Sequence, residues 1–334
     1  MSRLARFVEP LDIDPYANDP GHWGASLLTL AELIFPLLDA ARVRSVVEVG
    51  AYAGDLTGAL VRWAVGRDAR VTAIDPSPRA PLIELEQRHP ELELIRETSH
   101  EALGRIPVPD AAIIDGDHNY YTVSEELRLI AERTGDGPLP LLLFHDVAWP
   151  HARRDDYYDP ELIPPEHRRP IDEGTGLFPG VPGVRPGGLP YRYKAREEGG
   201  ARNGVLTAVE DFAEGREALR LAVVPAFFGL GVIWRADAPW ADAVAAIVEP
   251  WDRNPLLARL EASRVLHLAS SHVHLVEGAA AAERAARQEQ LLRRLLDSSA
   301  FGVAERLSRL RHRLGIATEA SIVSKSDVRR ALDG

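Results

Sequence analysis

Short apolar runs alternate with amphipathic segments over residues 43–144 of this chain. Runs rich in valine, isoleucine and leucine predict strands at 45–49, 70–74, 92–96, 110–115 and 139–144. Helical spacing of apolar residues predicts helices at 23–41, 55–65, 80–88, 100–103 and 122–132, and we expect Pro36 to kink or interrupt the first of them. This alternation predicts an α/β fold with a doubly wound, Rossmann-like, mostly parallel sheet.

The regular pattern stops between Asp146 and about Val205, where prolines and glycines are interleaved. No long helix or strand can form in such a segment. Its aromatic side chains, among them Trp149, Tyr157 and Tyr158, favour an ordered segment over a disordered one. We therefore interpret residues 147–204 as a lid that covers a substrate.

The pattern resumes after this lid. A helix is expected at 204–212, and two strands around a glycine-containing turn are expected within 219–234. Beyond residue 251 the chain is rich in alanine, leucine and arginine, which indicates two or more amphipathic helices that pack on the body or pair with another copy. The expected organisation is a helical lead-in at 1–42, a main domain at 43–250 with its lid, and a C-terminal helical extension at 251–334.

The turn after the first predicted strand has the composition of a cofactor-binding loop. It reads Glu48-x-Gly50-x-x-x-Gly54, and Asp75 closes the next strand. Glycines let the backbone approach a ligand, and a carboxylate at the tip of the next strand can accept both ribose hydroxyls. Tyr52 stands where a dinucleotide fingerprint needs glycine, so the tight pyrophosphate turn is missing. An alternative is an ordinary βα loop that binds nothing.

This turn resembles motif I of the class I S-adenosylmethionine-dependent methyltransferases, whose cofactor carries a sulfonium cation and no phosphate. The resemblance covers about residues 43–234 and implies that the last strand of the sheet runs antiparallel in a closing hairpin. It also implies that the acidic Glu48 suits the sulfonium and the ammonium group, that Asp75 holds the ribose, and that the segment of Ser99 and His100 flanks the adenine. The expected cofactor residues are thus Glu48, Gly50, Tyr52, Gly54, Asp75, Ser99, His100 and Asp115.

Acidic and imidazole side chains follow two predicted strands. Asp115, Asp117 and His118 come after the fourth strand, and His145 and Asp146 follow the fifth. Parallel strands bring these residues to the edge that carries Gly50. Carboxylates with imidazole can hold Mg²⁺ or another divalent cation, which would orient a sugar diol and lower the pKa of its hydroxyl. The alternative is that Asp115 binds loop amides and His118 caps the next helix.

This pair of segments resembles the metal-dependent macrocin O-methyltransferase family and, more loosely, the cephalosporin hydroxylase-like proteins. The resemblance implies that Asp115, His145 and Asp146 are the metal ligands and that Asp117 or His118 is the general base, with His145 also in the catalytic group. His145 departs from the pattern, because those families have a carboxylate there. The sequence therefore leaves open which metal is bound, and whether one is needed.

Charge and composition exclude several other classes of protein. The net charge is −11, and the surplus of acid lies in residues 1–251, because 252–334 hold 14 of the 39 basic and 10 of the 50 acidic residues. An acidic body disfavours nucleic acid as the main substrate. The absence of cysteine excludes disulfides, thiolate catalysis and cysteine-bound metals. No apolar run reaches the roughly 20 residues of a membrane span, so we expect a cytoplasmic protein.

These observations predict an enzyme that moves a methyl group from S-adenosylmethionine to an oxygen, or less readily a nitrogen, of a small polar metabolite such as a glycosylated natural product. Catalysis would consist mostly of positioning and water exclusion. Two alternatives remain open: a cofactor-binding hydroxylase-like enzyme, and a catalytically silent scaffold that assembles through its C-terminal helices. The expected partners are a small-molecule substrate and a second copy of the chain that pairs through those helices.

Overall fold

The computed structural model describes residues 25–316 and 324–333. Contacts between residues divide the chain into two units, Met1–Ser270 and Ser271–Gly334. The first unit contains the sheet and all of the candidate site residues. The first two residues of the helix expected at 23–41 lie outside the described residues.

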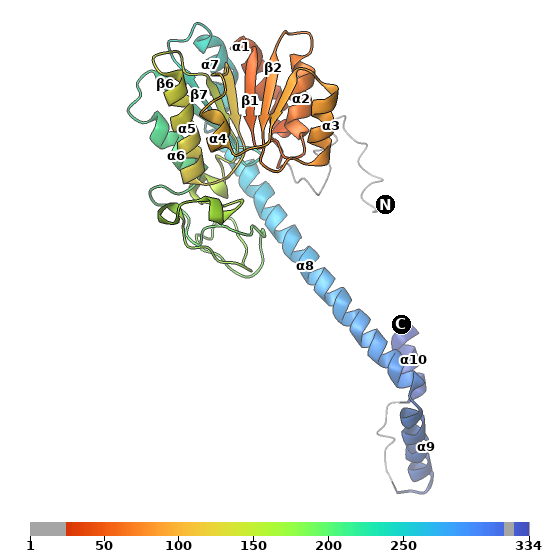
Figure 1. Ribbon diagram of the computed structural model, residues 1–334. Helices are drawn as coiled ribbons and strands as arrows, with labels where there is room; N and C mark the ends of the chain where they lie inside the picture. Colours follow the sequence, from red (N-terminus) through yellow and green to blue (C-terminus); the bar gives the residue numbers. More distant parts are fainter. Residues whose placement is uncertain (1–24, 317–323, 334) are drawn as a thin grey trace. The chain divides into compact units, whose positions relative to one another are not determined.

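Seven strands form one sheet in the order β3-β2-β1-β4-β5-β7-β6 (Figure 1). Strands β1 to β5 are parallel, and β7 runs antiparallel to both β5 and β6. The expected mostly parallel sheet with a closing antiparallel hairpin is thus confirmed. The strands are β1 (Ser45–Val49), β2 (Arg70–Ile74), β3 (Leu92–Ile95), β4 (Ala111–Ile114), β5 (Leu141–Phe144), β6 (Leu219–Val224) and β7 (Leu230–Arg235).

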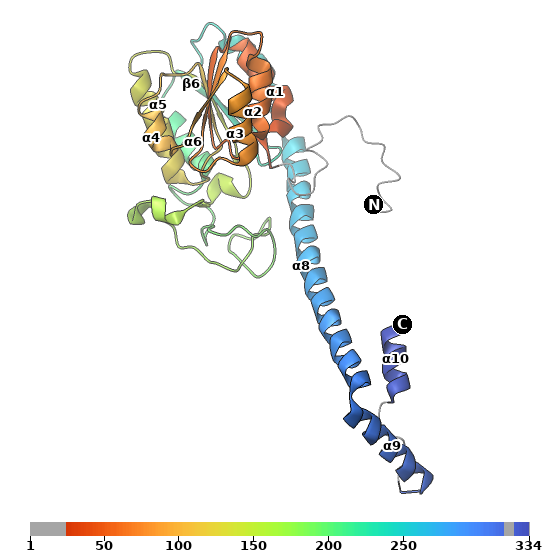
Figure 2. The ribbon, with the colours of Figure 1, turned by 45° about the vertical axis from the view of Figure 1, so that its right-hand side comes forward.

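Helices cover both faces of the sheet. Figure 2 shows α1, α2 and α3 on one face and α4, α5 and α6 on the other. The helices of this unit are α1 (Ala31–Ala40), α2 (Asp55–Ala64), α3 (Ala80–Arg88), α4 (Ser99–Leu103), α5 (Tyr120–Thr134), α6 (Val205–Ala213) and α7 (Ala241–Val248), with the 3-10 turns η3 (Leu27–Leu30) before α1 and η7 (Glu249–Trp251) after α7.

Each strand supplies two hydrophobic cores because successive side chains point to opposite faces. Val46 of β1 and Leu141 of β5 belong to the core with α1, α2 and α7, whereas Val47 and Leu142 belong to the core with α5 and α6. Burial on both faces explains why these strands are continuous apolar runs. The order of the strands reverses between β1 and β4, which is where a doubly wound sheet binds its ligand.

Of the two effects expected of Pro36, a kink or an interruption of the helix, the interruption does not occur. Helix α1 runs from Ala31 to Ala40 with Pro36 inside it. Ile34, Leu37 and Leu38 on either side of the proline are fully buried in the first core. Their burial is favourable enough to hold the helix together despite the backbone hydrogen bond that proline cannot donate.

The insertion between β5 and α6 is ordered by buried polar side chains rather than by regular elements. It contains the short 3-10 turns η4 (His151–Arg153), η5 (Pro160–Leu162) and η6 (Pro165–His167). The fully buried guanidinium of Arg154 donates to the carbonyl oxygens of Pro182, Ala195 and Arg196 at 2.5–2.9 Å. The Asp155 carboxylate accepts from the backbone N–H groups of Tyr120 and Gly204, at the starts of α5 and α6.

The C-terminal part of the chain is helical, as expected. Its elements are α8 (Pro255–Asp297), α9 (Ser299–Arg313) and α10 (Lys325–Asp333), and α8 crosses the division after Ser270. None of the helices in the described ranges has the combination of length and apolar character that a membrane span requires. Exposed leucines such as Leu275, Leu291 and Leu307 occur along α8 and α9. Pairing with a second copy through these helices stays a prediction.

The first turns of α8 hold the turn between β6 and β7. The buried Glu261 carboxylate accepts from the backbone N–H groups of Phe227 and Phe228 at 3.1 and 2.9 Å. Arg264 donates to both oxygens of the same carboxylate and lies over the Phe228 ring, 4.4 Å from its centroid. Phe227 and Phe228 have left-handed backbone conformations, so their N–H groups cannot take part in strand pairing. Glu261 supplies the acceptor that these two N–H groups need.

We predict that Glu261→Ala lowers the free energy of unfolding by about 2 to 4 kcal/mol, because it removes hydrogen bonds to a charged acceptor and leaves buried donors unpaired. Glu277→Ala, at an exposed position of α8, should change it by less than about 0.5 kcal/mol. Urea denaturation followed by circular dichroism measures both. Equal losses in the two variants would contradict this account of the turn.

Candidate active site

The turn after β1 is tightly packed at Gly50. Gly50 has φ +85°, a conformation that favours glycine, and its N–H donates to the Ile74 carbonyl at 2.9 Å. A Cβ at this position would lie 2.0 Å from the carbonyl oxygen of Asp115. The turn after β1 is thus pressed against the turn after β4, and only glycine allows that approach.

Asp75 fixes the conformation of the same turn. One carboxylate oxygen accepts from the Tyr52 N–H at 2.7 Å, and the other accepts from the Ser77 N–H at 2.7 Å. The guanidinium of Arg79 lies over the Tyr52 ring, 5.1 Å from its centroid. Gly54, with φ +89°, is the N-cap of α2. Asp75 therefore fixes the loop after β1, and its carboxylate still has lone pairs that could accept hydrogen bonds from a ligand.

A cavity of about 340 Å³ opens beside this turn, a size typical of small-molecule sites. The loops after β1 to β4 supply one wall, and Tyr158, Leu162 and Ile163 of the insertion supply another. The predicted site residues that line it are Gly50, Tyr52, Asp75, Ser99, His100 and Asp117. A larger hollow of about 480 Å³ between α5 and α6 has none of these residues in its wall.

Three of the expected cofactor residues do not line the cavity: Glu48, Gly54 and Asp115. Glu48 lies beneath the turn, almost fully buried, and its carboxylate accepts from the Thr57 hydroxyl at 2.6 Å. Burial raises the pKa of Glu48 to about 8. Its contact with the cofactor stays a prediction of the sequence.

Glu126 is a second buried carboxyl that the sequence interpretation missed. It is fully buried on α5, and a Cβ added to Gly116 in the cavity wall would lie 3.9 Å from its Oε1. Burial raises the pKa of Glu126 to about 8. A signal was present in the sequence, because Glu126 falls on the apolar face defined by Val123, Leu127 and Ile130.

His145 joins the two carboxylates that follow β4 and β5. Its Nδ1 lies 3.0 Å from Asp115 Oδ1 and 3.4 Å from Asp146 Oδ2, while its Nε2 lies 3.0 Å from the carbonyl oxygen of Phe227. Burial alone would lower the pKa of His145, but Asp115 and Asp146 outweigh it and raise the pKa to about 9. His145 is therefore a buried imidazolium with both nitrogens engaged.

His118 and Asp117 lie on the outer side of this group. His118 Nε2 is 3.0 Å from Asp146 Oδ2 and 3.8 Å from Asp115 Oδ1. Burial opposes protonation of His118, yet Asp146 and Asp115 together raise its pKa to about 10. The Asp117 carboxylate accepts from the Tyr158 N–H at 2.8 Å, and burial raises its pKa. Asp117 thus connects the loop after β4 to the insertion. Asn119, and not His118, caps α5.

Two groups of side chains offer donors for a metal ion within the described residues: Asp115 with His118 and Asp146, and His118 with His151 and Asp156. In each group the donor atoms lie within 4.8 Å of one another. Both sets of carboxylate and imidazole donors fit a divalent cation. His145, expected as a ligand, is in neither group. His151 and Asp156 were not foreseen, because no periodicity predicts the path of the insertion.

Comparisons with known proteins give one family match and several similar solved structures. Residues 47–147 match a family model described as a methyltransferase domain. Similar solved structures include SAH-bound methyltransferase PaMTH1 of Podospora anserina, 15% identical over 67% of this chain and 89% of the other, with a TM-score of 0.40. Cofactor-bound Rv0187 from MTB is 13% identical over 66% of this chain and 90% of the other, with a TM-score of 0.40. A putative caffeoyl-CoA O-methyltransferase from Staphylococcus aureus is 14% identical over 62% of this chain and 83% of the other, with a TM-score of 0.36. A search of curated proteins gives no match.

The sheet order and the glycine turn are those of a Rossmann-like, doubly wound fold. The match shows a methyltransferase domain over residues 47–147, which agrees with the class I S-adenosylmethionine-dependent methyltransferases that the sequence resembles.

We predict that Gly50→Ala destabilises the protein by more than the roughly 1 to 3 kcal/mol of backbone strain alone, because its Cβ collides with the Asp115 carbonyl. Gly66→Ala is the matched control, since Gly66 also has a positive φ but a Cβ there meets nothing within 4 Å. Urea denaturation of both variants measures the difference. Equal destabilisation would show that the two turns are not pressed together.

The buried Glu48 predicts a pH dependence of stability. Its pKa rises from 4.5 to about 8 on folding, so between these values the folded state keeps a proton that the unfolded state has lost. This carboxyl therefore makes stability fall as pH rises through that window, by about 1.4 kcal/mol for each pH unit. Glu48→Gln cannot titrate, so its stability relative to the wild type should increase from pH 5.5 to 7.5.

Glu93→Gln, at an exposed position of β3, is the control and should leave the wild-type pH dependence unchanged. Denaturant midpoints at a series of pH values provide the data. A constant difference between Glu48→Gln and the wild type across this range would contradict the raised pKa.

Proposed function

We propose that this enzyme transfers the methyl group of S-adenosylmethionine to a hydroxyl oxygen of a small polar metabolite, such as a sugar-bearing natural product. The observation that supports it most directly is the position of Asp117. This carboxylate lines the same cavity as Gly50 and Asp75 and lies where the insertion meets the strand ends. The cavity wall therefore contains a carboxylate that can accept a proton, the glycine turn after β1 and part of the insertion.

The cavity wall supplies groups that suit the parts of the cofactor. The Asp75 carboxylate keeps lone pairs free for ribose hydroxyls, and the polar side chains of Ser99 and His100 line the wall after β3. Gly50 leaves room for a ligand to approach the backbone. The cofactor supplies an electrophilic methyl group on a sulfonium. The chain then has to hold an acceptor oxygen in line with that methyl group.

Asp117 is the proposed general base. The sequence left Asp117 and His118 as alternatives, and of the two only Asp117 lines the cavity. His118 is held in its protonated form by Asp146 and Asp115, which raise its pKa to about 10. A divalent cation at either donor group would lower the pKa of a hydroxyl that it binds. His145 acts as a positioning residue, because it keeps Asp115 and Asp146 in place.

The insertion is the proposed selector of the acceptor. Leu162 and Ile163 add apolar surface to the cavity, and Tyr158 is fixed by its N–H bond to Asp117. Excluding water at this wall strengthens the electrostatic interactions inside. An apolar wall beside a carboxylate base favours a neutral hydroxyl acceptor over a charged amine, because burying an ammonium there would be costly.

Methyl transfer from isotope-labelled S-adenosylmethionine to a panel of glycosylated and polyhydroxylated acceptors tests the proposal. We predict that Asp117→Asn lowers the rate for the best acceptor by about 100-fold to 10,000-fold, which is the usual contribution of a general base. Cofactor affinity, measured by calorimetry, should change little. Asp159→Asn, another carboxylate of the cavity wall, is the matched control and should retain activity within a few-fold.

Three results would contradict the proposal in different ways. Full activity of Asp117→Asn would remove the base assignment alone. Cofactor binding without methyl transfer to any acceptor would favour hydroxylase-like chemistry. A chain that shows neither heat of binding nor thermal stabilisation with S-adenosylmethionine would be the silent scaffold.

A further inference from the structure

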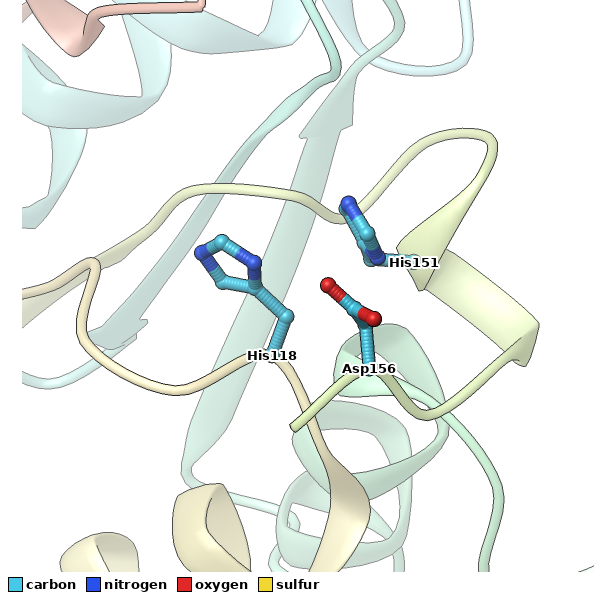
Figure 3. Close-up of side chains that lie close together, drawn as sticks. All are labelled: His118, His151 and Asp156. Carbon is cyan, nitrogen blue, oxygen red and sulfur yellow. The ribbon is translucent and has the colours of Figure 1, made fainter. Parts of the chain in front are cut away.

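His118, His151 and Asp156 form a compact group that shares His118 with the group of Asp115 and Asp146. His118 comes from the loop after β4, whereas His151 and Asp156 belong to the start of the insertion. Figure 3 shows the Asp156 carboxylate beneath the His151 ring, with a ring nitrogen of His118 turned towards the other two residues. The ring centroids of His118 and His151 are 4.7 Å apart, and the donor atoms of the three side chains lie within 4.8 Å of one another.

Two donor atoms of this group have no hydrogen-bond partner among the residues that the structure describes. They are Nδ1 of His151, a side chain that is only 2% exposed, and Oδ1 of Asp156. Leaving a buried polar atom unpaired costs about 1 to 3 kcal/mol. A cation between them would satisfy both atoms at once, which no side chain in the group does.

The Nε2 atom of His118 contacts a carboxylate, as the second ring nitrogen of a metal-binding histidine usually does. Its Nε2 lies 3.0 Å from Asp146 Oδ2. A histidine that binds a metal usually donates its second ring N–H to a carboxylate, which fixes the tautomer and the orientation of the ring. The Nε2–H can donate to Asp146 at the end of β5, and Nδ1 of His118 lies on the side of His151 and Asp156 (Figure 3), where a bound cation would displace its proton.

In the other donor group, Asp115 with His118 and Asp146, the charges of the two carboxylates are already compensated by a neighbouring imidazole. Nδ1 of His145 lies 3.0 Å from Asp115 and 3.4 Å from Asp146, so each carboxylate has an imidazole partner. In the group with His151 and Asp156, by contrast, His151 Nδ1 and Asp156 Oδ1 lack a hydrogen-bond partner among the described residues. Its donors, two imidazoles and one carboxylate, are those of borderline transition metals rather than of Mg²⁺, which prefers oxygen.

We propose that His118, His151 and Asp156 bind a divalent cation of the borderline class, such as Zn²⁺ or Fe²⁺, at a position separate from the Asp115–Asp146 pair. Three protein ligands leave coordination positions open for water or for an oxygen of a ligand. The cation would also join the loop after β4 to the first turns of the insertion. This proposal does not depend on the methyl acceptor, because binding is measured without it.

Full-length protein is stripped with a chelator, exchanged into chelator-free buffer and titrated with Zn²⁺ alone. We expect about one tightly bound Zn²⁺ per chain by elemental analysis, and a higher melting temperature. His151→Asn and Asp156→Asn should each weaken Zn²⁺ binding by at least about ten-fold, because even the hydrogen-bond partners of ligands account for about 10-fold to 100-fold. His167→Asn, a histidine elsewhere in the insertion, should bind as the wild type does.

Asp115→Asn distinguishes the two positions. It should keep Zn²⁺ binding within a few-fold if the cation lies between His151 and Asp156. Loss of Zn²⁺ in Asp115→Asn with retention in His151→Asn would place the cation between Asp115 and Asp146 and overturn the proposal. Absence of tight Zn²⁺ and Fe²⁺ binding by the wild type would also overturn it. Circular dichroism and urea denaturation confirm that each variant is folded.

Discussion

The close approach of the Gly50 backbone to the Asp115 carbonyl is the constraint on which the rest of the site depends. It brings the turns after β1 and β4 together at the point where the strand order reverses. The backbone of Asp115 faces the cofactor turn, while its side chain faces His145. Asp115 thereby connects the shape of the cavity to the charged group of His145 and Asp146. A movement of the turn after β4 would change both the turn at Gly50 and the position of this charged group.

The charge of that group follows from one substitution relative to the families that the sequence resembles. The sequence resemblance implies a carboxylate at the position of His145, with a divalent cation among the acidic side chains. Here the imidazolium of His145 supplies a positive charge between Asp115 and Asp146. Because its Nε2 lies 3.0 Å from the Phe227 carbonyl, the turn that Glu261 holds also positions this charge. A positive charge beside the donor group of Asp115, His118 and Asp146 makes the proposed group of His118, His151 and Asp156 the more favourable place for a metal.

The parts of the structure that the sequence predicted are those that a repeating pattern or the topology determines. Strands β1 and β2 and helix α3 begin and end at the predicted residues, because apolar runs there stop at glycine, proline or charge. The strand-end residues Asp115 and Asp146 were foreseen because parallel strands must end at one edge. The insertion follows neither rule. Its path depends on buried polar bonds such as those of Arg154, which have no period, so the approach of His151 and Asp156 to His118 was beyond prediction.

Two buried carboxyl groups beside the cavity give cofactor binding a further consequence. Glu48 lies beneath the turn after β1 and Glu126 lies behind Gly116, and burial raises the pKa of each to about 8. Both are neutral acids at pH 7, so the cavity can be assembled without paying the full cost of burying two more negative charges. A positive charge that arrives nearby favours the ionised form of such an acid. If S-adenosylmethionine binds in this cavity as proposed, its positive charge would favour loss of a proton from Glu48 or Glu126, and the affinity for it would therefore rise with pH.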